Sequence, residues 1–508
     1  MDDLRTMAEV QQTGSSEGIP GEATRQMLLK TIELYPQMAS ARANLGRWYA
    51  QQGFWEQAVA LYQEAIRLQP DNAIVYRSLA RAWHRLEESE KASIATNRAQ
   101  ELQSNSITRT QRFGKDPLLA FQEEDVRQQE NGSDGKEGNV KIFFYPDYRE
   151  TNPYQSLLYS DVPENYLIEP GSIDTALESL EKNREDKTYK AVVFHLHWTS
   201  VLLGRAKTLA EAQMAKFSFI EKIYKFVRKG GYLVWTIHNL YPHECQYLDE
   251  EIELRTTLCQ VASKIHLHSK NALAEVAKHY PISREKIQII PHGSYVGVYQ
   301  NNITRMQARH YFGFSENEFV FLFFGQIRPY KGTDELISAF TKTCEKISNV
   351  RLIVAGQPKY LMQEKSVKAQ VEKIPEITVV EEFIPDEDLQ WFFNAADVVV
   401  LPYRQVLTSG SLVAALSFGC PVIVPNHPTI QDWVRDGENG FIYELGDVDS
   451  LVQVMLEVAN FDKERREVLS KNAFDGIKAL SWENCVQLLF EEYSRSNVKK
   501  MAVSEKVK

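Results

Sequence analysis

Between residues 140 and 424, short runs of apolar residues alternate with longer stretches that have the spacing of amphipathic helices. A short apolar run without polar alternation is typical of a parallel strand that is buried on both faces of its sheet. The first series of runs covers residues 140–145, 191–197, 232–238, 264–268 and 287–291. The second series covers residues 319–325, 350–356, 377–380, 398–401 and 421–424. The pattern therefore predicts an α/β protein with two Rossmann-like, doubly wound parallel sheets, one after the other along the chain.

Ahead of the first series, the sequence contains a helical repeat. Residues 39–72 have the length of a tetratricopeptide unit, and Gly46, Tyr49 and Ala58 stand at positions typical of its two helices. A looser copy follows, and Pro36 ends what resembles a preceding half-repeat. Because so short an array buries little apolar surface alone, we expect it either to bind a protein partner or to act as a stabilising cap on the rest of the chain.

The net charge and the cysteine spacing limit which partners and which cellular compartment are expected for this protein. A formal net charge of −10 argues against a nucleic-acid partner, because phosphate binding relies on clustered and unbalanced Lys and Arg. The five cysteines stand singly, without the spacing of a metal site or a disulfide framework, which favours a reducing compartment. The first residues are polar and acidic, and no apolar run is long enough to cross a bilayer. We therefore expect a cytoplasmic protein.

The turn after the run at residues 319–324 carries groups that an anionic ligand would need. Its sequence is Gly325-Gln326-Ile327-Arg328-Pro329-Tyr330-Lys331-Gly332. Glycine permits a close approach of the backbone, and Arg328 and Lys331 can neutralise a diphosphate and the charge that grows on a leaving group. The same pattern also fits a surface turn whose cations are solvated.

A second candidate anion site precedes the apolar helical stretch at residues 412–418. Thr408 or Ser409 can cap a helix that begins near Gly410. The first free amides of such a helix would point at the carboxyl ends of the strands, where they favour an anion. The two candidate elements are therefore expected to face one crevice.

These motifs occur in an order that resembles the donor half of the family 4 glycosyltransferases, which are retaining enzymes of the GT-B fold. The resemblance rests on GQIRPYKG at residues 325–332, RLIVAGQ at 351–357, FIPDEDLQWFFNAADVVVLPY at 383–403 and PVIVPNHPTIQDWVRDGENGFIY at 421–443. With the first half included, it covers residues 140–494. It implies a hexosyltransferase that uses a nucleotide-diphosphate sugar as donor, a glycan or lipid-linked acceptor and no cofactor, and that acts in polysaccharide assembly.

The repeats, the resemblance and the composition together divide the chain. Residues 104–138 are rich in Gly, Ser, Gln and charged residues, which predicts a linker. The full division is a flexible tail (1–20), tetratricopeptide-like repeats (21–103), the linker (104–138), an acceptor domain (139–300), a nucleotide-sugar domain (301–480), a helix crossing back to the acceptor domain (481–497) and a second tail (498–508). The roles of the two α/β domains and of the last helix are implied by the resemblance alone.

The resemblance also implies a donor site in the second half. Arg328 and Lys331 are implied to be catalytic through the donor diphosphate. The other donor-binding residues would be Gly325, Gln326, Phe383, Ile384, Thr408, Ser409, Gly410, Ser411 and Leu412. The chain departs from the family pattern where Gln326 replaces an Arg, and where Val406 and Ala414 replace two carboxylates near the donor sugar and the ribose.

In the first half, polar residues follow the predicted strands. The resemblance places His238 beside the donor sugar as a third catalytic residue. The acceptor cleft would contain His195, His197, Asn239, His243, Glu244 and His292. Each histidine also fits a structural side chain with satisfied hydrogen bonds. The spacing of His195 and His197 invites a metal, but no third ligand stands at a fixed spacing, so no metal site is expected.

Alternative partners and functions remain open. Residues 216–229 have one apolar and one basic helical face, which suits a cover for the sheet or a peripheral contact with anionic lipid at the inner face of a membrane. The two missing carboxylates also suit a catalytically weakened sugar-nucleotide-binding scaffold that recruits partners through its repeats. A sugar-nucleotide epimerase shares the two-domain architecture, but the second half offers no acid–base carboxylates at the usual places.

Overall fold

The chain forms two compact units. The structure, a computed structural model, describes residues 25, 26, 28, 29, 32, 33, 36, 39–68, 70, 73–112, 139–242, 245–358, 367, 371, 372 and 374–495. One unit comprises residues 1–132, 202–221 and 246–254, and the other comprises residues 133–201, 222–245 and 255–508. The first unit therefore contains the repeats together with two segments from the first α/β region.

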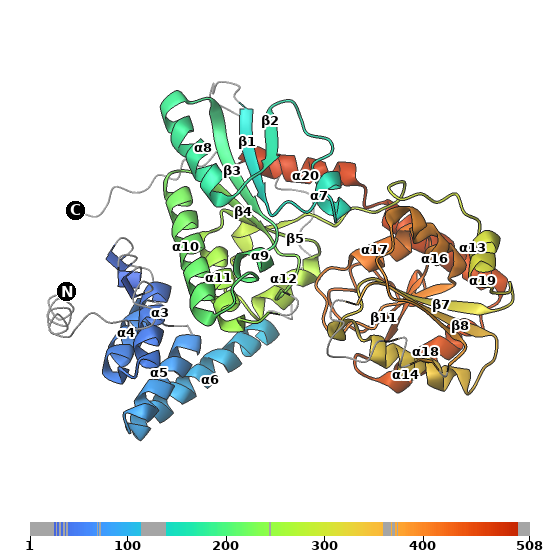
Figure 1. Cartoon of the computed structure of the whole chain (residues 1–508), viewed down its shortest axis with the longest axis horizontal. Coiled ribbons are helices and arrows are strands. Elements are labelled where there is room, and N and C mark those ends of the chain that lie inside the picture. The colour runs from blue at the N-terminus through green and yellow to red at the C-terminus, as the bar shows by residue number, and fades with distance from the viewer. Residues whose placement is uncertain are drawn as a thin grey trace. The chain divides into compact units, whose positions relative to one another are not determined.

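The described repeats of the first unit are helical. They form α3 (Ala39–Gln51), α4 (Trp55–Leu68), α5 (Ala73–Arg85) and α6 (Ser89–Arg112), and each helix packs on the next (Figure 1). Close packing requires small residues, since a Cβ atom on Gly46 would lie 3.0 Å from the Tyr62 ring. The predicted start of the linker at residue 104 is wrong, because α6 continues to Arg112. No Gly or Pro interrupts this stretch, so the helix can propagate.

The first sheet has six parallel strands in the order β2-β1-β3-β4-β5-β6. The strands are β1 (Asn139–Tyr145), β2 (Tyr166–Pro170), β3 (Tyr189–Leu196), β4 (Tyr232–Thr236), β5 (Lys264–Leu267) and β6 (Ile287–Ile289). The helices of this region are α7 (Pro153–Leu158), α8 (Ile173–Asp186), α9 (Ser200–Leu203), α10 (Leu209–Arg228), α11 (Leu248–Val261) and α12 (Lys270–Ala277), with a 3₁₀ turn η1 (Arg284–Lys286).

The second sheet also has six parallel strands, in the order β12-β11-β10-β7-β8-β9. The strands are β7 (Phe319–Phe324), β8 (Val350–Ala355), β9 (Ile377–Val380), β10 (Val398–Val400), β11 (Val422–Pro425) and β12 (Gly440–Tyr443). The other elements are α13 (Arg305–Phe312), η2 (Pro329–Lys331), α14 (Thr333–Cys344), η3 (Asp386–Asp388), α16 (Leu389–Ala395), α17 (Gly410–Ser417), α18 (Val448–Ala459), α19 (Lys463–Lys478) and α20 (Trp482–Arg495). Two tandem parallel sheets confirm the predicted fold class.

Each face of the second sheet has its own core. Residues of α16, α17 and α19 form one buried cluster with alternate side chains of the strands, and residues of α14 and α18 form the other (Figure 1). Because both faces are covered, the strands read as continuous apolar runs, as in Phe319–Phe324. This burial explains why the inner strands were predictable from hydrophobicity.

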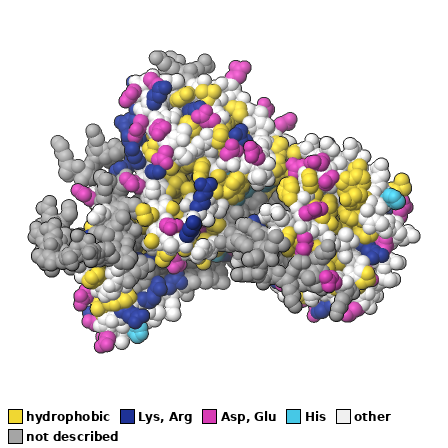
Figure 2. Space-filling view, in the orientation of Figure 1, with side chains coloured by type: hydrophobic (Ala, Val, Ile, Leu, Met, Phe, Trp, Pro, Cys, Tyr) yellow, Lys and Arg dark blue, Asp and Glu magenta, His cyan; other side chains and the backbone are white. Residues whose placement is uncertain are grey.

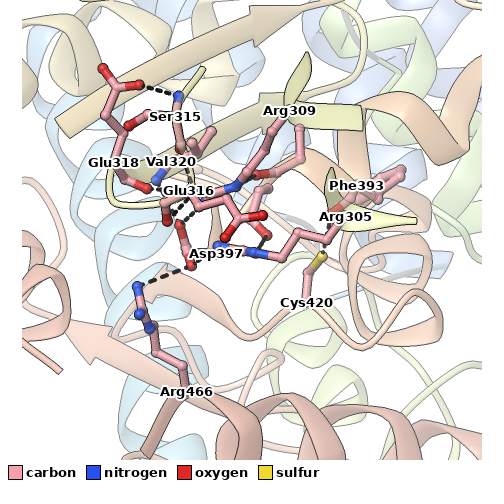
Figure 3. A network of polar contacts seen from close by, with 12 residues as sticks. Arg305, Arg309, Ser315, Glu316, Glu318, Val320, Phe393, Asp397, Cys420 and Arg466 are labelled. Carbon is pink, nitrogen blue, oxygen red and sulfur yellow. Dashed lines mark hydrogen bonds and ion pairs between the residues drawn. The ribbon is translucent and has the colours of Figure 1, made fainter. Parts of the chain in front are cut away.

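A charged cluster around Asp397 ties together the amino-terminal ends of strands in the second sheet (Figure 3). The Asp397 carboxylate accepts hydrogen bonds from Arg305, from Arg309 at 2.6 Å and from the Val320 amide at 2.8 Å. The fully buried Arg309 also donates to the backbone oxygen of Glu318 at 2.7 Å. Buried charges are tolerated here because their partners satisfy them. The cluster lies at the amino-terminal edge, so it stabilises the domain rather than forming a ligand site.

The helix α20 packs on the first sheet. Its residues Cys485, Leu489 and Tyr493 are buried in the same hydrophobic cluster as Val140 and Val193 of that sheet. The Tyr166 hydroxyl donates to the backbone oxygen of Phe490 at 3.2 Å, and the Tyr232 hydroxyl donates to Glu492 at 2.7 Å. Residues near the carboxyl end of the described chain thus complete the core of the first α/β region.

The lysines of residues 216–229, the stretch that suggested a lipid contact, all have carboxylate partners. Lys216 is buried and paired with Glu250 and Glu253, Lys222 pairs with Asp174, and Lys225 and Lys229 pair with Glu181. In Figure 2, basic and acidic side chains lie interspersed over the visible face. Among the described helices, none is long and apolar enough to cross a membrane. Contact with lipid stays a prediction.

Candidate functional site

The second sheet has a pocket at the place where its strand order reverses. The strands β8 and β9 extend the sheet on one side of β7, whereas β10, β11 and β12 extend it on the other side. Ligands of doubly wound sheets bind at this switch point, outside the carboxyl ends of the strands. A pocket of about 240 Å³ lies there, lined by Asn239, Leu240, Tyr241, Pro242, Tyr330, Lys331, Tyr403, Gln405, Val406, Leu407, Thr408, Ser409, Gly410 and Ser411.

Lys331 supplies the positive charge of the pocket. It ends the 3₁₀ turn η2, and its Nζ atom lies 5.5 Å from the centre of the Tyr403 ring. Desolvation, with a smaller contribution from Arg328, lowers the pKa of Lys331 to about 8. Lys331 is the one charged side chain among the described lining residues. A desolvated cation of this kind gains most from an anionic ligand.

Gly325 makes room for this lysine. Its φ angle is +123°, and a Cβ atom there would lie 2.8 Å from Lys331 Nζ and 2.7 Å from Ser411 Oγ. Both distances are shorter than a side-chain carbon tolerates, and the φ angle is one that L residues rarely adopt. Glycine after β7 therefore lets Lys331 and Ser411 converge on one point.

The amino-terminal end of α17 supplies backbone donors. Ser409 is the N-cap, and its hydroxyl accepts the Leu412 amide at 3.1 Å and lies 2.9 Å from the Tyr403 hydroxyl. Gly410 and Ser411 carry the first two amides of the helix, for which no partner exists within the helix itself. These amides, the helix dipole and Lys331 together suit a diphosphate.

The two positions at which the resemblance would place carboxylates are part of the core. Val406 is 9% exposed and Ala414 is 5% exposed, and both belong to the cluster under α17. Thr408, next to Ser409, has a buried hydroxyl oxygen without a hydrogen-bond partner in the described structure. The described lining therefore offers hydroxyl and amide groups in place of carboxylates, and no side chain there can act as a carboxylate nucleophile.

Arg404 was not predicted, and it fixes the turn that carries Lys331. Its guanidinium pairs with Asp334 and Glu335 at the start of α14 and donates to the Pro329 oxygen, each at 2.7 Å. The Arg404 amide also donates to the Tyr330 oxygen at 2.8 Å. Arg404 directly follows the motif Pro402-Tyr403 in the sequence. Its partners Asp334 and Glu335 stand about 70 positions earlier, so residue spacing could not predict these ion pairs.

The carboxyl edge of the first sheet is occupied by six histidines. His195 lies in β3 and His197 follows it, His238 follows β4, His266 lies in β5 and His268 follows it, and His292 follows β6. All six are buried, with at most 9% of the side chain exposed. Four of them were predicted as site residues, and none of the six is among the described residues that line the pocket.

Four of the six histidines form one chain of hydrogen bonds, whereas the buried Nε2 atom of His266 has no hydrogen-bond partner in the described structure. His268 Nδ1 lies 3.0 Å from the Ile290 carbonyl, which can only accept. His268 Nε2 lies 3.2 Å from His238 Nδ1, and His238 Nε2 lies 3.3 Å from His197 Nδ1. The chain continues through the Tyr159 hydroxyl, which lies 2.8 Å from His197 Nε2 and 2.8 Å from His195 Nδ1.

The Ile290 carbonyl sets the tautomers of the neutral rings of His268, His238 and His197. His268 must donate from Nδ1, so its Nε2 accepts from His238, and His238 Nε2 in turn accepts from His197. Burial lowers the pKa values of His266 and His268 to about 3 and that of His292 to about 4. It also holds the pKa values of His195, His197 and His238 well below their usual range. The rings are therefore neutral near pH 7.

His238 has both ring nitrogens engaged by other histidines. Its ring also stacks on Trp198, with the ring centres 4.1 Å apart and the planes 14° apart. It precedes Asn239, whose loop lines the pocket and whose backbone oxygen accepts from the buried Arg255. In this geometry His238 positions the loop of Asn239, and its predicted contact with a donor sugar stays a prediction.

The remaining predicted residues that the structure describes are not among the lining residues of the pocket. Phe383 is 66% exposed, whereas Ile384 is buried in the core. Arg328 donates to Gln326 beside the turn. His243 and Glu244 lie outside the described residues. No group of three His, Cys, Asp or Glu among the described residues has the geometry to hold a metal ion.

Comparison with known proteins agrees with this architecture. Residues 305–475 match the family of Glycosyl transferases group 1, and residues 46–86 match a TPR repeat. The GDP-mannose:glycolipid 4-beta-D-mannosyltransferase of Xanthomonas campestris pv. campestris is 27% identical over 316 residues, which cover 60% of this chain and 80% of the relative. The capsular polysaccharide biosynthesis glycosyltransferase CapM of Staphylococcus aureus is 25% identical over 54% of this chain and 73% of its own.

Solved structures show the same fold. Anabaena Alr3699/HepE, determined with UDP and glucose, superposes with a TM-score of 0.53 at 16% identity, over 70% of this chain and 99% of its own. A glycosyltransferase of Rickettsia africae superposes with a TM-score of 0.51 at 12% identity, over 72% of this chain and 99% of its own. The chain thus has the GT-B fold preceded by helical repeats, and within it residues 305–475 match the group 1 glycosyltransferase family.

Proposed function

We propose that this protein transfers a hexose from a nucleotide-diphosphate sugar to a glycan or lipid-linked acceptor, with retention of configuration, in polysaccharide assembly at the cytoplasmic side of a membrane. The observation that carries the proposal is the pocket at the switch point of the second sheet. There Lys331 and the first amides of α17 converge from two loops. The relatives named above, which include a mannosyltransferase with a glycolipid acceptor and a capsular glycosyltransferase, support the same reaction class.

The proposed step uses these groups to stabilise the leaving group. The bond between the anomeric carbon and the diphosphate oxygen breaks, and its electron pair stays on that oxygen. Lys331 and the amides of Gly410 and Ser411 stabilise the developing charge. The acceptor hydroxyl forms the new bond from the same face, and its proton passes to the diphosphate oxygen. Because the described lining holds no carboxylate nucleophile, the pathway through a covalent glycosyl-enzyme is disfavoured.

Donor binding is the first test. Calorimetric titration of the whole chain with UDP-, GDP-, ADP- and CMP-linked sugars should give saturable binding for one nucleotide. Lys331→Ala should abolish that binding, whereas Lys342→Ala should not, since Lys342 is an exposed lysine on α14 that pairs with Asp449. Absence of binding to every donor would overturn the proposal.

The stereochemistry needs its own measurement. The printed name of the Xanthomonas relative specifies a β linkage for that enzyme, so the anomeric configuration has to be determined for this one. Proton NMR of the product, compared with the donor, gives the configuration directly. An inverted product would leave the transferase standing and overturn retention.

A second candidate function is a sugar-nucleotide-binding scaffold. Val406 and Ala414, in place of carboxylates, favour it, because loss of charged donor contacts weakens catalysis before it removes the fold. Donor binding without turnover for any acceptor, together with a partner captured by the repeats, would favour the scaffold over the enzyme.

A further inference from the structure

The first unit contains a second and larger cavity. Its volume is about 1200 Å³, which exceeds the roughly 300–1,000 Å³ of most small-molecule sites. It is lined by Arg47, Ala50, Trp55, Tyr62, Ser78, Arg81, His84, Arg85, Glu87, Leu209, Gln246, Tyr247, Leu248, Asp249 and Glu250. The repeats supply one wall, and the segments 202–221 and 246–254 supply the other.

A buried ionic cluster fixes these two walls together. Arg47 of α3 donates to Glu250 and to Glu253, each at 2.7 Å. The same two carboxylates hold the fully buried Lys216, and Gln213 donates to Glu250 at 3.0 Å. Two cations and two anions balance, so the cluster is satisfied within the unit. The cavity is therefore preformed rather than assembled by its ligand.

Beside this cluster, Phe217 packs into the repeats. It forms a buried cluster with Leu28, Leu45 and Leu61. The repeats are thus an integral wall of the unit. This contact favours the stabilising cap over an independent docking module.

The lining combines aromatic rings with planar polar groups. The Arg85 guanidinium lies 5.7 Å from the centre of the Trp55 ring, and both residues line the cavity. Tyr62 and Tyr247 add two further rings. A sugar ring presents an apolar face of C–H groups and a rim of hydroxyls, so it matches a wall with aromatic faces and polar edges.

The charges of the lining balance as well. Arg47, Arg81 and Arg85 stand against Glu87, Asp249 and Glu250. A strongly charged partner of either sign gains little from such a wall, because attraction to one half is offset by repulsion from the other. Hydroxyl groups donate and accept at once, so they can use both the arginines and the carboxylates.

We propose that this cavity is a saccharide site that holds a neutral oligosaccharide of several rings. The site stands on its own residues, and its assignment to a glycan acceptor rests on the proposed function. An extended peptide fits less well, because its backbone requires rows of amide groups or an open strand edge. Among the described lining residues, Gln246 is the one side-chain amide.

Direct binding tests the proposal without any transfer reaction. Maltohexaose, cellohexaose and β-1,4-mannohexaose are titrated into the whole chain, with an acidic decapeptide as the competing class. We expect at least one hexaose to bind saturably and the peptide not to bind. Binding of the peptide more tightly than every hexaose, or no hexaose binding, would overturn the site.

Two exposed arginines of α5 provide a matched pair of variants. Arg81→Ala should weaken hexaose binding about tenfold, whereas Arg77→Ala should leave it unchanged, since Arg77 lies on the same helix and does not line the cavity. Trp55→Ala should remove binding, and far-UV circular dichroism checks that the repeats remain folded. Equal loss in Arg77→Ala and Arg81→Ala would contradict the proposal. Donor binding at the Lys331 pocket, measured in the same variants, separates failure of this site from failure of the transferase.

Discussion

The two sheets of this protein use their carboxyl edges in opposite ways. At the first sheet, six buried histidines fill the edge, and four of them are joined by hydrogen bonds to one another, to Tyr159 and to the Ile290 carbonyl. At the second sheet, a glycine, a capped helix end and one lysine leave a pocket of about 240 Å³. Both edges are polar, but among the described residues the lysine and the helix-end amides that a ligand could use lie at the second edge.

This difference shows that polar residues after a strand do not by themselves mark a ligand site. Four histidines of the first edge are joined by hydrogen bonds, so they define a rigid and neutral wall. The first amides of α17 have no acceptor within their helix, and Lys331 has no carboxylate beside it in the described lining, so an anionic ligand can pair with both. Changes in pH should therefore act on the first edge, and anionic ligands should act on the second.

Acidification should give the largest effect, and it should act through the first edge. The depressed histidine pKa values mean that the unfolded chain binds more protons than the folded chain below pH 6.5, so stability falls as the pH falls through that range. At pH 5, His266, His268 and His292 together should remove about 6 kcal/mol of stability relative to pH 7. Urea unfolding between pH 5 and pH 7.5 measures this slope.

A single substitution sharpens that measurement. His266→Phe removes one buried imidazole ring that takes up a proton on unfolding. The slope of the unfolding free energy against pH should therefore fall by an amount that corresponds to at most one proton. His310→Gln, which removes an exposed histidine of α13, is the matched control. An unchanged slope in His266→Phe would mean that another group causes the acid sensitivity.

Loss of Lys331 should lower the activity of the pocket at the second sheet without lowering the stability of the fold. Lys331→Ala should lower turnover by at least about 10²-fold, because a preorganised charge at the leaving group is removed. Thermal unfolding should change little, since the lysine is desolvated in the free protein. Steady-state kinetics with the donor found by calorimetry measures the loss, and full activity would contradict the proposed role.

Breaking the histidine chain should lower the free energy of unfolding by less than acidification does. His268→Leu leaves the Ile290 carbonyl and His238 Nδ1–H without their partner, so unfolding should become easier by about 2–4 kcal/mol. Donor affinity should stay within about threefold of the native value. A variant that kept its stability but lost donor binding would show that the two edges are coupled.

Arg404→Ala should have the smallest effect. Its ion pairs with Asp334 and Glu335 are partly exposed, so the loss of stability should be about 1 kcal/mol or less. The turn that carries Lys331 should become looser, and donor affinity should fall about fivefold. Arg435→Ala, on an exposed surface pair with Glu438, is the control, and an equal loss of affinity there would exclude a specific role for Arg404.

The sequence predicted ten of the twelve described strands and missed β2 and β12. Each is one of the two edge strands of its sheet, and the other two edge strands, β6 and β9, were predicted. An edge strand pairs on one side only, so its residues need not be uniformly apolar, as Tyr-Leu-Ile-Glu-Pro in β2 illustrates. The helical repeats and the two-sheet architecture were predictable because their patterns repeat along the chain.

The candidate site was predictable only in part. Lys331 and residues 408–411 form local motifs, and the structure brings them to one pocket. The histidine chain depends on Tyr159 and on Tyr493, whose hydroxyl lies 2.6 Å from His195. Tyr159 stands 36 positions and Tyr493 stands 298 positions from His195, so only the fold could reveal that these groups form one chain of hydrogen bonds.

The position of α20 also has a consequence for synthesis of the chain. The core of the first sheet contains Cys485, Leu489 and Tyr493, which leave the ribosome after the entire second sheet. Domains usually fold in the order in which they are synthesised. Here the face of the first sheet that α20 covers stays exposed until the second sheet has been synthesised. Chaperone binding to nascent chains should therefore persist until residues 482–495 emerge.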